Sequence, residues 1–259
     1  MKTIKIQCPA KVNLDLRVFP RDPQTGFHAI KSIMQTISLF DYLTITISEG
    51  NEINLSGTSN EIPYNEKNIC YKVTKDFLEK INKTLKVEIH IEKNIPVCAG
   101  LAGGSTNAAG VLLGLNELLN NPLTKEDLHK LALKSGSDIN FCLEGGTKLC
   151  TGRGEKMIDM PFYDFKLSLV KPKNLQISAR EAYEAFDNLK EESNMRNDLE
   201  FALLDKYKEL KFLNELGLQM SGSGPTFFLR DKNFDVKIDE SEYLIINNLN
   251  SVDHGVKII

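Results

Sequence analysis

The chain has 259 residues, of which 41% are hydrophobic and 26% charged, so its composition is that of a globular protein with one large domain or two smaller ones. These proportions exclude disorder, collagen-like repetition and coiled coil. The formal net charge of −3 excludes a general excess of surface cations, and we expect neither nucleic acid nor membrane as a partner.

The sequence carries no targeting or membrane segment that we recognise. The longest uncharged stretch, Asn94–Asn116, has the length of a membrane span, but glycines and polar residues interrupt its middle and predict a loop and a helix. The first residues lack the pattern of a signal peptide. The five cysteines and four histidines show no CxxC, HxxxH or HExxH spacing, which predicts reduced thiols and no site for a transition metal. We therefore expect a cytoplasmic protein; its oligomeric state stays open.

Apolar and polar residues alternate through residues 4–18, which predicts a β-strand. Its non-core face is expected to carry Lys11, Asn13 and Asp15 together. Pro9 cannot donate a hydrogen bond to a neighbouring strand, so a bulge or an edge position is expected near it.

The remaining elements follow from periodicity and from capping boxes, in which Ser or Thr precedes an acidic residue by three positions. The predicted strands are Tyr42–Ile47, Leu85–Ile91, Lys166–Lys171 and Thr226–Leu229, and the predicted helices are Ile69–Ile81, Ala108–Leu119, one that begins after Thr124, and one that begins after Ser178 and continues with breaks to Glu215. Strands and helices are mixed rather than strictly alternating, which favours an α+β fold. A turn-rich run before Lys166 predicts two domains, 1–160 and 161–259.

The most informative segment is residues 95–116, IPVCAGLAGGSTNAAGVLLGLN. Its glycines allow a ligand to approach the backbone closely, and the free N–H groups at the start of the following helix favour an anion such as phosphate. A tight turn with an ordinary N-cap is the alternative. The segment is not a Walker A loop, because it lacks GK[ST].

Two charged residues are candidates for chemistry beside such a loop. Lys11 could supply positive charge, although a lone lysine on a strand is usually solvated. Asp138 follows a glycine-serine turn, where an aspartate is more often a turn or cap residue. The second glycine-rich turn, SGSGP at residues 221–225, could simply end a helix and start a strand.

Three segments together resemble the motifs of the GHMP kinases: PAKVNLDL at 9–16, PVCAGLAGGSTNAA at 96–109 and MSGSGPTFF at 220–228. GFH at 26–28 and GSDINF at 136–141 are similar to the members of this family that act in non-mevalonate isoprenoid biosynthesis. The resemblance runs over nearly the whole chain and is strongest before residue 160.

The resemblance implies a two-domain GHMP kinase fold, with an N-terminal domain like the second domain of ribosomal protein S5, a ferredoxin-like C-terminal domain, and the active site between them. It also implies that the SGSGP turn lies beside the glycine-rich loop. It implies transfer of the γ-phosphoryl group of ATP, with Mg²⁺, to the 2-hydroxyl of a small-molecule substrate, a cytidyl-methylerythritol diphosphate. The alternatives are another small-molecule GHMP kinase, of mevalonate or homoserine type, and a non-catalytic nucleotide sensor.

The resemblance also implies residue roles. Asp138 matches the family's catalytic aspartate and Lys11 its catalytic lysine. The matching nucleotide-binding positions are Asn68, Pro96, Gly100, Leu101, Ala102, Gly103, Gly104, Ser105 and Thr106. The matching acceptor-binding positions are Asn13, Phe27, His28 and Tyr183. No metal ligand is assigned, although Ser105 and Thr106 lie nearby in sequence.

Two positions depart from the family pattern. Phe27 stands where tyrosine is usual, so the flat ring is kept and a hydroxyl is lost. Ala102 stands where glycine is common. An alanine at positive φ would cost about 1–2 kcal/mol, and we expect that this position does not require it.

Overall fold

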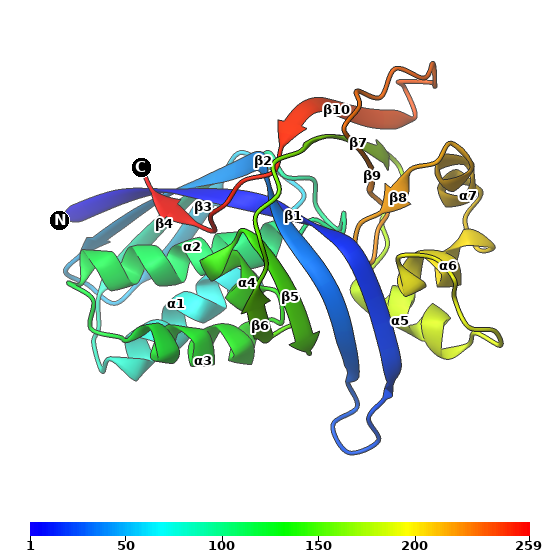
Figure 1. Ribbon diagram of the computed structural model, residues 1–259. Helices are drawn as coiled ribbons and strands as arrows, with labels where there is room; N and C mark the ends of the chain where they lie inside the picture. The colour runs from blue at the N-terminus through cyan, green and yellow to red at the C-terminus, as the bar shows by residue number, and fades with distance from the viewer.

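Two long antiparallel strands organise the structure. The computed structural model describes residues 1–259, and in it β1 (Lys2–Arg21) pairs with β2 (His28–Ser48) along almost the whole length of both (Figure 1). These strands belong to a seven-stranded sheet of order β11-β1-β2-β4-β3, in which β5 pairs with β2 and β6 with β5. Its other strands are β3 (Ile53–Gly57), β4 (Lys86–Glu92), β5 (Thr147–Gly152), β6 (Lys156–Asp159) and β11 (Lys257–Ile258).

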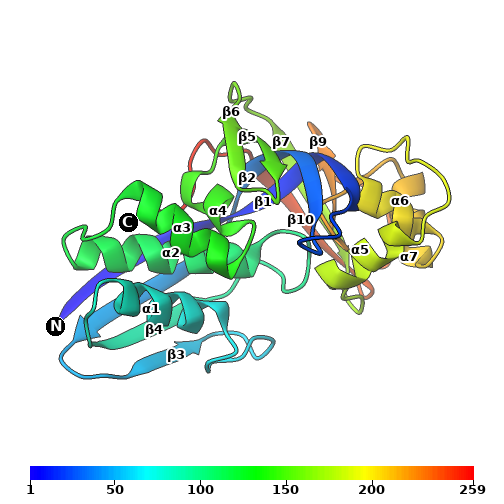
Figure 2. The same cartoon turned by 90° about the horizontal axis from the view of Figure 1, so that it is seen from below.

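Four helices cover one face of this sheet, and α2 lies directly on β1 and β2 (Figures 1 and 2). The approach is close because Gly110 and Gly114 face the sheet: a Cβ at Gly110 would lie 2.6 Å from Cys8 Sγ, and one at Gly114 2.7 Å from Ile45 Cδ1. The helices are α1 (Ile69–Lys80), α2 (Gly103–Leu118), α3 (Lys125–Ser135) and α4 (Ile139–Glu144).

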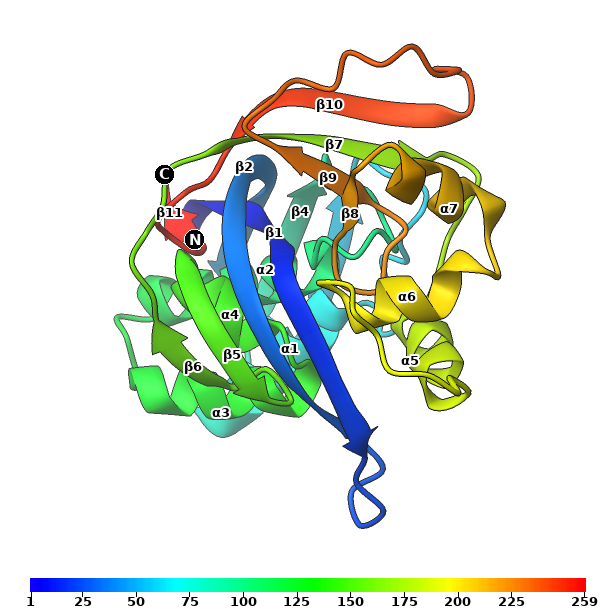
Figure 3. The same ribbon diagram turned by 45° about the vertical axis from the view of Figure 1, so that its right-hand side comes forward.

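The second sheet has four antiparallel strands in the order β10-β7-β9-β8, and α5, α6 and α7 lie beside it (Figure 3). Counted from β7, this is the 4-1-3-2 order of a ferredoxin-like βαββαβ unit. The connection between β9 and β10 contains no helix, so the second helix of that unit is absent. The elements are β7 (Lys166–Pro172), α5 (Ala179–Asp187), α6 (Asp198–Leu204), α7 (Lys208–Glu215), β8 (Gln219–Met220), β9 (Phe227–Arg230) and β10 (Tyr243–Asn250).

The end of the chain returns to the first sheet, where Ile258 of β11 pairs with Ile6 of β1 (Figure 3). The division predicted between residues 160 and 161 falls between β6 and β7, and stays a prediction. None of the helices combines the length and the apolar character that a bilayer span needs.

The α+β fold and the predicted helices are confirmed. Thr124 caps α3 by accepting from the N–H of Asp127, and Ser178 caps α5 by accepting from the N–H of Glu181. The strand prediction was incomplete: it covered only the last part of β2 and missed β3, β5, β6, β8, β10 and β11. Most of these are short or carry polar residues on both faces, and their pairing partners are distant in sequence.

Apolar and polar residues alternate regularly along β1, but at two bulges the side chains change from one face of the strand to the other. The register against β2 shifts between Pro9 and Ala10, which confirms the expected bulge. Before it, Cys8 packs in the core under α2. After it, Ala10 and Val12 pack in a separate cluster with residues of the second sheet. Lys11, between them, therefore points away from this cluster, toward the start of α4, where its Nζ lies 3.5 Å from Asp138 Oδ2.

A second register shift lies between Asn13 and Asp15. Beyond it Leu16 lines the same cavity as Lys11 and Asn13, and Asp15 does not. The predicted common face was right for Lys11 and Asn13 and wrong for Asp15, because the bulge reverses the strand faces between them.

Glu200 of α6 is a carboxylate only 1% exposed. Its Oε2 accepts from the backbone N–H of Met220 at 3.0 Å, and its Oε1 accepts from Nδ2 of Asn214 at 2.9 Å. Burial outweighs both hydrogen bonds and raises the pKa of Glu200 to about 7. The ordinary pKa of a glutamate is 4.5. At a pH between 4.5 and about 7, Glu200 is therefore still protonated in the folded protein, whereas in the unfolded chain it has released its proton.

We predict that this group lowers the free energy of unfolding by up to about 3 kcal/mol as the pH rises from 4.5 to 7, and that Glu200→Gln removes this loss. Urea unfolding of the variant and the wild type at pH 5 and pH 8 measures it. The stability of the variant relative to the wild type should rise between the two pH values. Parallel pH dependences would contradict the raised pKa.

Candidate functional site

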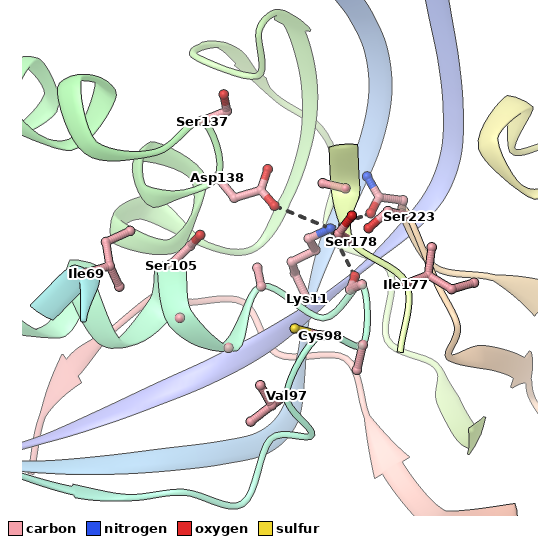
Figure 4. A pocket seen from close by; sticks show the side chains of 18 of the residues that line it. Lys11, Ile69, Val97, Cys98, Ser105, Ser137, Asp138, Ile177, Ser178 and Ser223 are labelled. Carbon is pink, nitrogen blue, oxygen red and sulfur yellow. Dashed lines mark hydrogen bonds and ion pairs between the residues drawn. The ribbon is translucent and has the colours of Figure 1, made fainter. Parts of the chain in front are cut away.

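Lys11 lies in a cavity of about 820 Å³ and is only 4% exposed. The cavity is lined by β1 and β2, by the starts of α1, α2 and α4, and by α5 and the SGSGP turn. Lys11 Nζ donates to Asn13 Oδ1 at 2.6 Å and to the carbonyl oxygen of Gly100 at 3.1 Å, and lies 3.5 Å from Asp138 Oδ2. In Figure 4 the side chains of Lys11 and Asp138 point toward each other, one from β1 and the other from the start of α4. Lys11 is therefore not the solvated lysine of the alternative interpretation.

Asp138 occupies the N-cap position of α4, yet its side chain makes no capping hydrogen bond. The carboxylate is 30% exposed and turned into the cavity instead. An aspartate whose role was to cap the helix would accept a hydrogen bond from a backbone N–H of the first turn. Its carboxylate is thus available to a ligand.

The glycine-rich loop enters α2 through Ala102, which has φ +57° and no side-chain hydrogen bond to the helix. Our expectation that this position avoids positive φ was wrong, because the chain reaches the helix through a left-handed residue. This entry also differs from an ordinary N-cap. Gly103, Gly104 and Ser105 line the cavity, so the first N–H groups of α2 border it. The geometry suits an anion at this helix end.

Two residues of the predicted loop lie outside the cavity lining. Leu101 is buried in the same apolar cluster as Ala10 and Val12, and its carbonyl oxygen accepts from the N–H of Lys11 at 3.1 Å. Thr106 is fully buried, and its Oγ1 has no hydrogen-bond partner. Both residues therefore shape the loop from beneath.

The SGSGP turn lies against the glycine-rich loop. Ser221 Oγ donates to the carbonyl oxygen of Gly100 at 3.0 Å and accepts from the N–H of Asn13 at 3.2 Å. A Cβ at Gly100 would lie 2.1 Å from the carbonyl oxygen of Ser221. The three motifs, distant in sequence, are therefore in direct contact at one point.

Asn68 and Pro96 border the cavity at the end formed by α1 and the glycine-rich loop. Asn68 is the N-cap of α1: its Oδ1 accepts from the N–H of Cys70 at 2.9 Å, and its Nδ2 donates to the carbonyl oxygen of Pro63 at 2.6 Å. These bonds fix the loop before α1, and Ile62 and Ile69 supply apolar surface beside it.

Phe27, His28 and Tyr183 border the opposite end of the cavity. His28 stacks on Tyr183 of α5 with ring centroids 5.1 Å apart, and Phe27, in the loop between β1 and β2, is half exposed. Burial raises the pKa of Tyr183 to about 12, and the negative charge of Asp138 contributes in the same direction. The hydroxyl of Tyr183 therefore stays protonated at neutral pH and can donate a hydrogen bond.

Sequence reasoning missed a buried ion pair beneath the glycine-rich loop. Asp41 is fully buried and accepts from Lys93 Nζ at 2.6 Å, Asn107 Nδ2 at 2.9 Å, and the N–H groups of Asn94 and Ile95 at 2.7 and 2.8 Å. The pair fixes the segment that leads from β4 into the loop. One signal in the sequence was the lone acidic residue in an otherwise apolar stretch, SLFDYLTI.

Three further residues that line the cavity could not be identified from the sequence. Ile177 and Ser178 reach the cavity from the start of α5, and Arg153 reaches it from the turn between β5 and β6. Each lies in a segment whose sequence predicts only a cap or a turn.

Comparison with known proteins identifies the family. The pattern of the GHMP kinases N terminal domain matches residues 68–146. The 4-diphosphocytidyl-2-C-methyl-D-erythritol kinase of Clostridium beijerinckii is 38% identical over 254 residues, covering 87% of this chain and 90% of the relative. That of Clostridioides difficile is 37% identical and covers 100% and 98%.

The chain belongs to the GHMP kinase family, among the 4-diphosphocytidyl-2-C-methyl-D-erythritol kinases. A crystal structure of 4-(cytidine 5'-diphospho)-2C-methyl-D-erythritol kinase superimposes with a TM-score of 0.72 at 30% identity, covering 87% of this chain and 89% of the other. Homoserine kinase from Cytophaga hutchinsonii has a TM-score of 0.75 at 17% identity, with 100% and 98% coverage, and shows the fold alone.

Asp138 is the only Asp or Glu among the residues that line the cavity of this GHMP kinase. No group of three or more His, Cys, Asp or Glu side chains is placed to hold a metal ion. A hard cation here would therefore depend on oxygens of a bound phosphate and of water.

We predict that Gly100→Ala strongly destabilises this GHMP kinase, because the new Cβ would overlap the carbonyl oxygen of Ser221 and force the two glycine-rich turns apart. Gly217→Ala is the matched control, since Gly217 also has positive φ but has no atom within 4 Å of the new Cβ. The control should cost about 1–2 kcal/mol of unfolding free energy, from strain alone. Gly100→Ala should cost roughly 1–3 kcal/mol more. Equal losses in urea unfolding would show that the contact is not tight.

Proposed function

We propose that this chain transfers the γ-phosphoryl group of ATP to the 2-hydroxyl of 4-diphosphocytidyl-2-C-methyl-D-erythritol. The observation that carries the proposal is the meeting of Lys11 and Asp138, 3.5 Å apart, beside the glycine-bordered start of α2. Relatives with the name of this activity, 37–38% identical over most of the chain, support it. The aromatic end of the cavity suits a cytosine base, since a flat ring stacks on Phe27 or Tyr183 at about 1–3 kcal/mol.

In the proposed reaction Asp138 is the base. Its carboxylate accepts the proton of the acceptor hydroxyl while that oxygen attacks the γ-phosphorus and ADP leaves. The side chain is suited to this role because no helix N–H occupies its oxygens. Its partner in the reaction, Lys11, holds the carboxylate in place from 3.5 Å and lies where charge on the moving phosphoryl group would be stabilised.

The phosphates of ATP are proposed to bind at the start of α2, where the N–H groups of Gly103, Gly104 and Ser105 border the cavity. Adenine would lie toward Asn68 and Pro96. Bound Mg²⁺ would neutralise charge on the phosphates. Of the two hydroxyls near this helix start, that of Ser105 lines the cavity and would add a ligand to the phosphate and water oxygens, whereas Thr106 is buried.

Kinetics with three acceptors test the proposal. ADP release is measured with ATP and Mg²⁺ plus 4-diphosphocytidyl-2-C-methyl-D-erythritol, mevalonate or homoserine, and without acceptor. We expect kcat/KM for the cytidyl acceptor to exceed the others by at least roughly 100-fold, because only that acceptor fills the aromatic end. A preference for an acceptor without cytosine would make the chain another small-molecule kinase, and no turnover by folded protein would favour a nucleotide sensor.

We predict that Asp138→Asn lowers kcat by roughly 100-fold or more, because an amide cannot accept the proton. The KM for ATP should change little, since the carboxylate contacts the acceptor. Asp235→Asn, an exposed carboxylate outside the cavity, is the matched control and should leave kcat unchanged. Retained turnover in Asp138→Asn would exclude Asp138 as the base.

A further inference from the structure

The geometry points to Arg153 as the residue that binds the diphosphate of the acceptor. This inference rests on the proposed function, because the diphosphate is the part of that acceptor that joins cytidine to methylerythritol. Arg153 matches none of the motifs that carry the family resemblance, and it lies in the turn 153–155 between β5 and β6.

Arg153 is held in place by Phe27. The guanidinium carbon lies 3.7 Å from the centroid of the Phe27 ring, which is a cation–π contact, and both residues line the cavity. Stacking on an aromatic face orients the guanidinium plane and leaves its N–H edge free to donate. The backbone N–H of Arg153 donates to Glu155 Oε2 at 2.6 Å, which fixes the turn.

Arg153 lacks an anionic partner. Three other cations of the lining each have one: Lys11 has Asp138, Arg21 has Asp187, and Lys93 has Asp41. Lys67 also lacks one, but it adjoins Asn68 at the nucleotide end. In addition, Nε of Arg153 is buried and makes no hydrogen bond. The protein therefore offers neither an anion nor an acceptor for Nε to this guanidinium, and a phosphate bound by its other N–H groups would compensate its charge.

The position of Arg153 matches the order of groups in the acceptor. At one side it contacts Phe27, where the base is proposed to stack. At the other, its neighbour Gly154 lies against the residue before Asp138: a Cβ at Gly154 would be 3.6 Å from the carbonyl oxygen of Ser137. With the base at Phe27 and the hydroxyl at Asp138, the diphosphate must cross the region between them. A guanidinium binds phosphate oxygens there through two parallel N–H donors.

A comparison of the affinities for cytidine 5'-diphosphate and for cytidine separates the contact of Arg153 with the diphosphate from recognition of the base, because only the first ligand has a diphosphate. Calorimetric titration of the wild type, Arg153→Gln and Arg153→Lys gives both dissociation constants. We expect Arg153→Gln to weaken cytidine 5'-diphosphate about 10- to 100-fold and to leave cytidine nearly unchanged. Arg153→Lys should fall between, because it keeps the charge and loses the two parallel donors. The KM for the acceptor should rise, and the KM for ATP should not.

Lys156→Gln is the matched control, since it removes one positive charge from an exposed position on the same hairpin, outside the cavity. It should leave the ratio of the two dissociation constants unchanged. If the wild type turns over the acceptor and Arg153→Gln keeps the wild-type ratio, the inference is overturned and the proposed function stands. If the folded wild type neither turns over the acceptor nor distinguishes cytidine 5'-diphosphate from cytidine, both are overturned.

Discussion

The structure depends on one buried ammonium group. Removing the charge of Lys11 from water is costly, and it is offset by three oxygens, those of Asn13, Gly100 and Asp138, around Nζ. Asn13 belongs to the same strand, but Gly100 comes from the loop before α2 and Asp138 from the start of α4. The same ammonium group thus fixes the strand, the loop and the helix relative to one another. Lys11, which we propose acts in phosphoryl transfer, therefore also stabilises the arrangement of the segments that form the cavity.

The second constraint is steric, at the contact between the two glycine-rich turns. Gly100 touches the backbone of Ser221, and a Cβ at Gly222 would lie 3.0 Å from Asn13 Oδ1 and 3.1 Å from Lys11 Nζ. Side chains at these positions would hold the second sheet away from Lys11. Asn197 supports the turn from behind, because its Nδ2 donates to the carbonyl oxygens of Met220 and Gly222, both at 2.9 Å. The cavity therefore exists only when the parts of the chain that form both sheets have folded and packed together.

The two ends of the cavity are built from different parts of the fold. The proposed nucleotide end uses the loop and helices that pack on the first sheet, and the buried Asp41–Lys93 pair fixes it from beneath. The proposed acceptor end uses segments at the periphery: the β1–β2 loop with Phe27, the β5–β6 turn with Arg153, and α5 with Tyr183. None of these peripheral segments belongs to the glycine-rich loop or to α2.

The sequence by itself determined the elements whose signal is local: the alternation of β1, the capped helices α3 and α5, and the glycine-rich entry to α2. It also indicated that Lys11 and Asp138 belong to one site, through motifs that resemble a family, but their direct contact was shown only by the tertiary structure. Tertiary structure alone decided the face of Asp15, the left-handed Ala102, the Asp41–Lys93 pair and the place of Arg153. The physical reason is that local periodicity reports which residues are buried, whereas bulges, close backbone contacts and ion pairs between distant segments depend on how the elements pack.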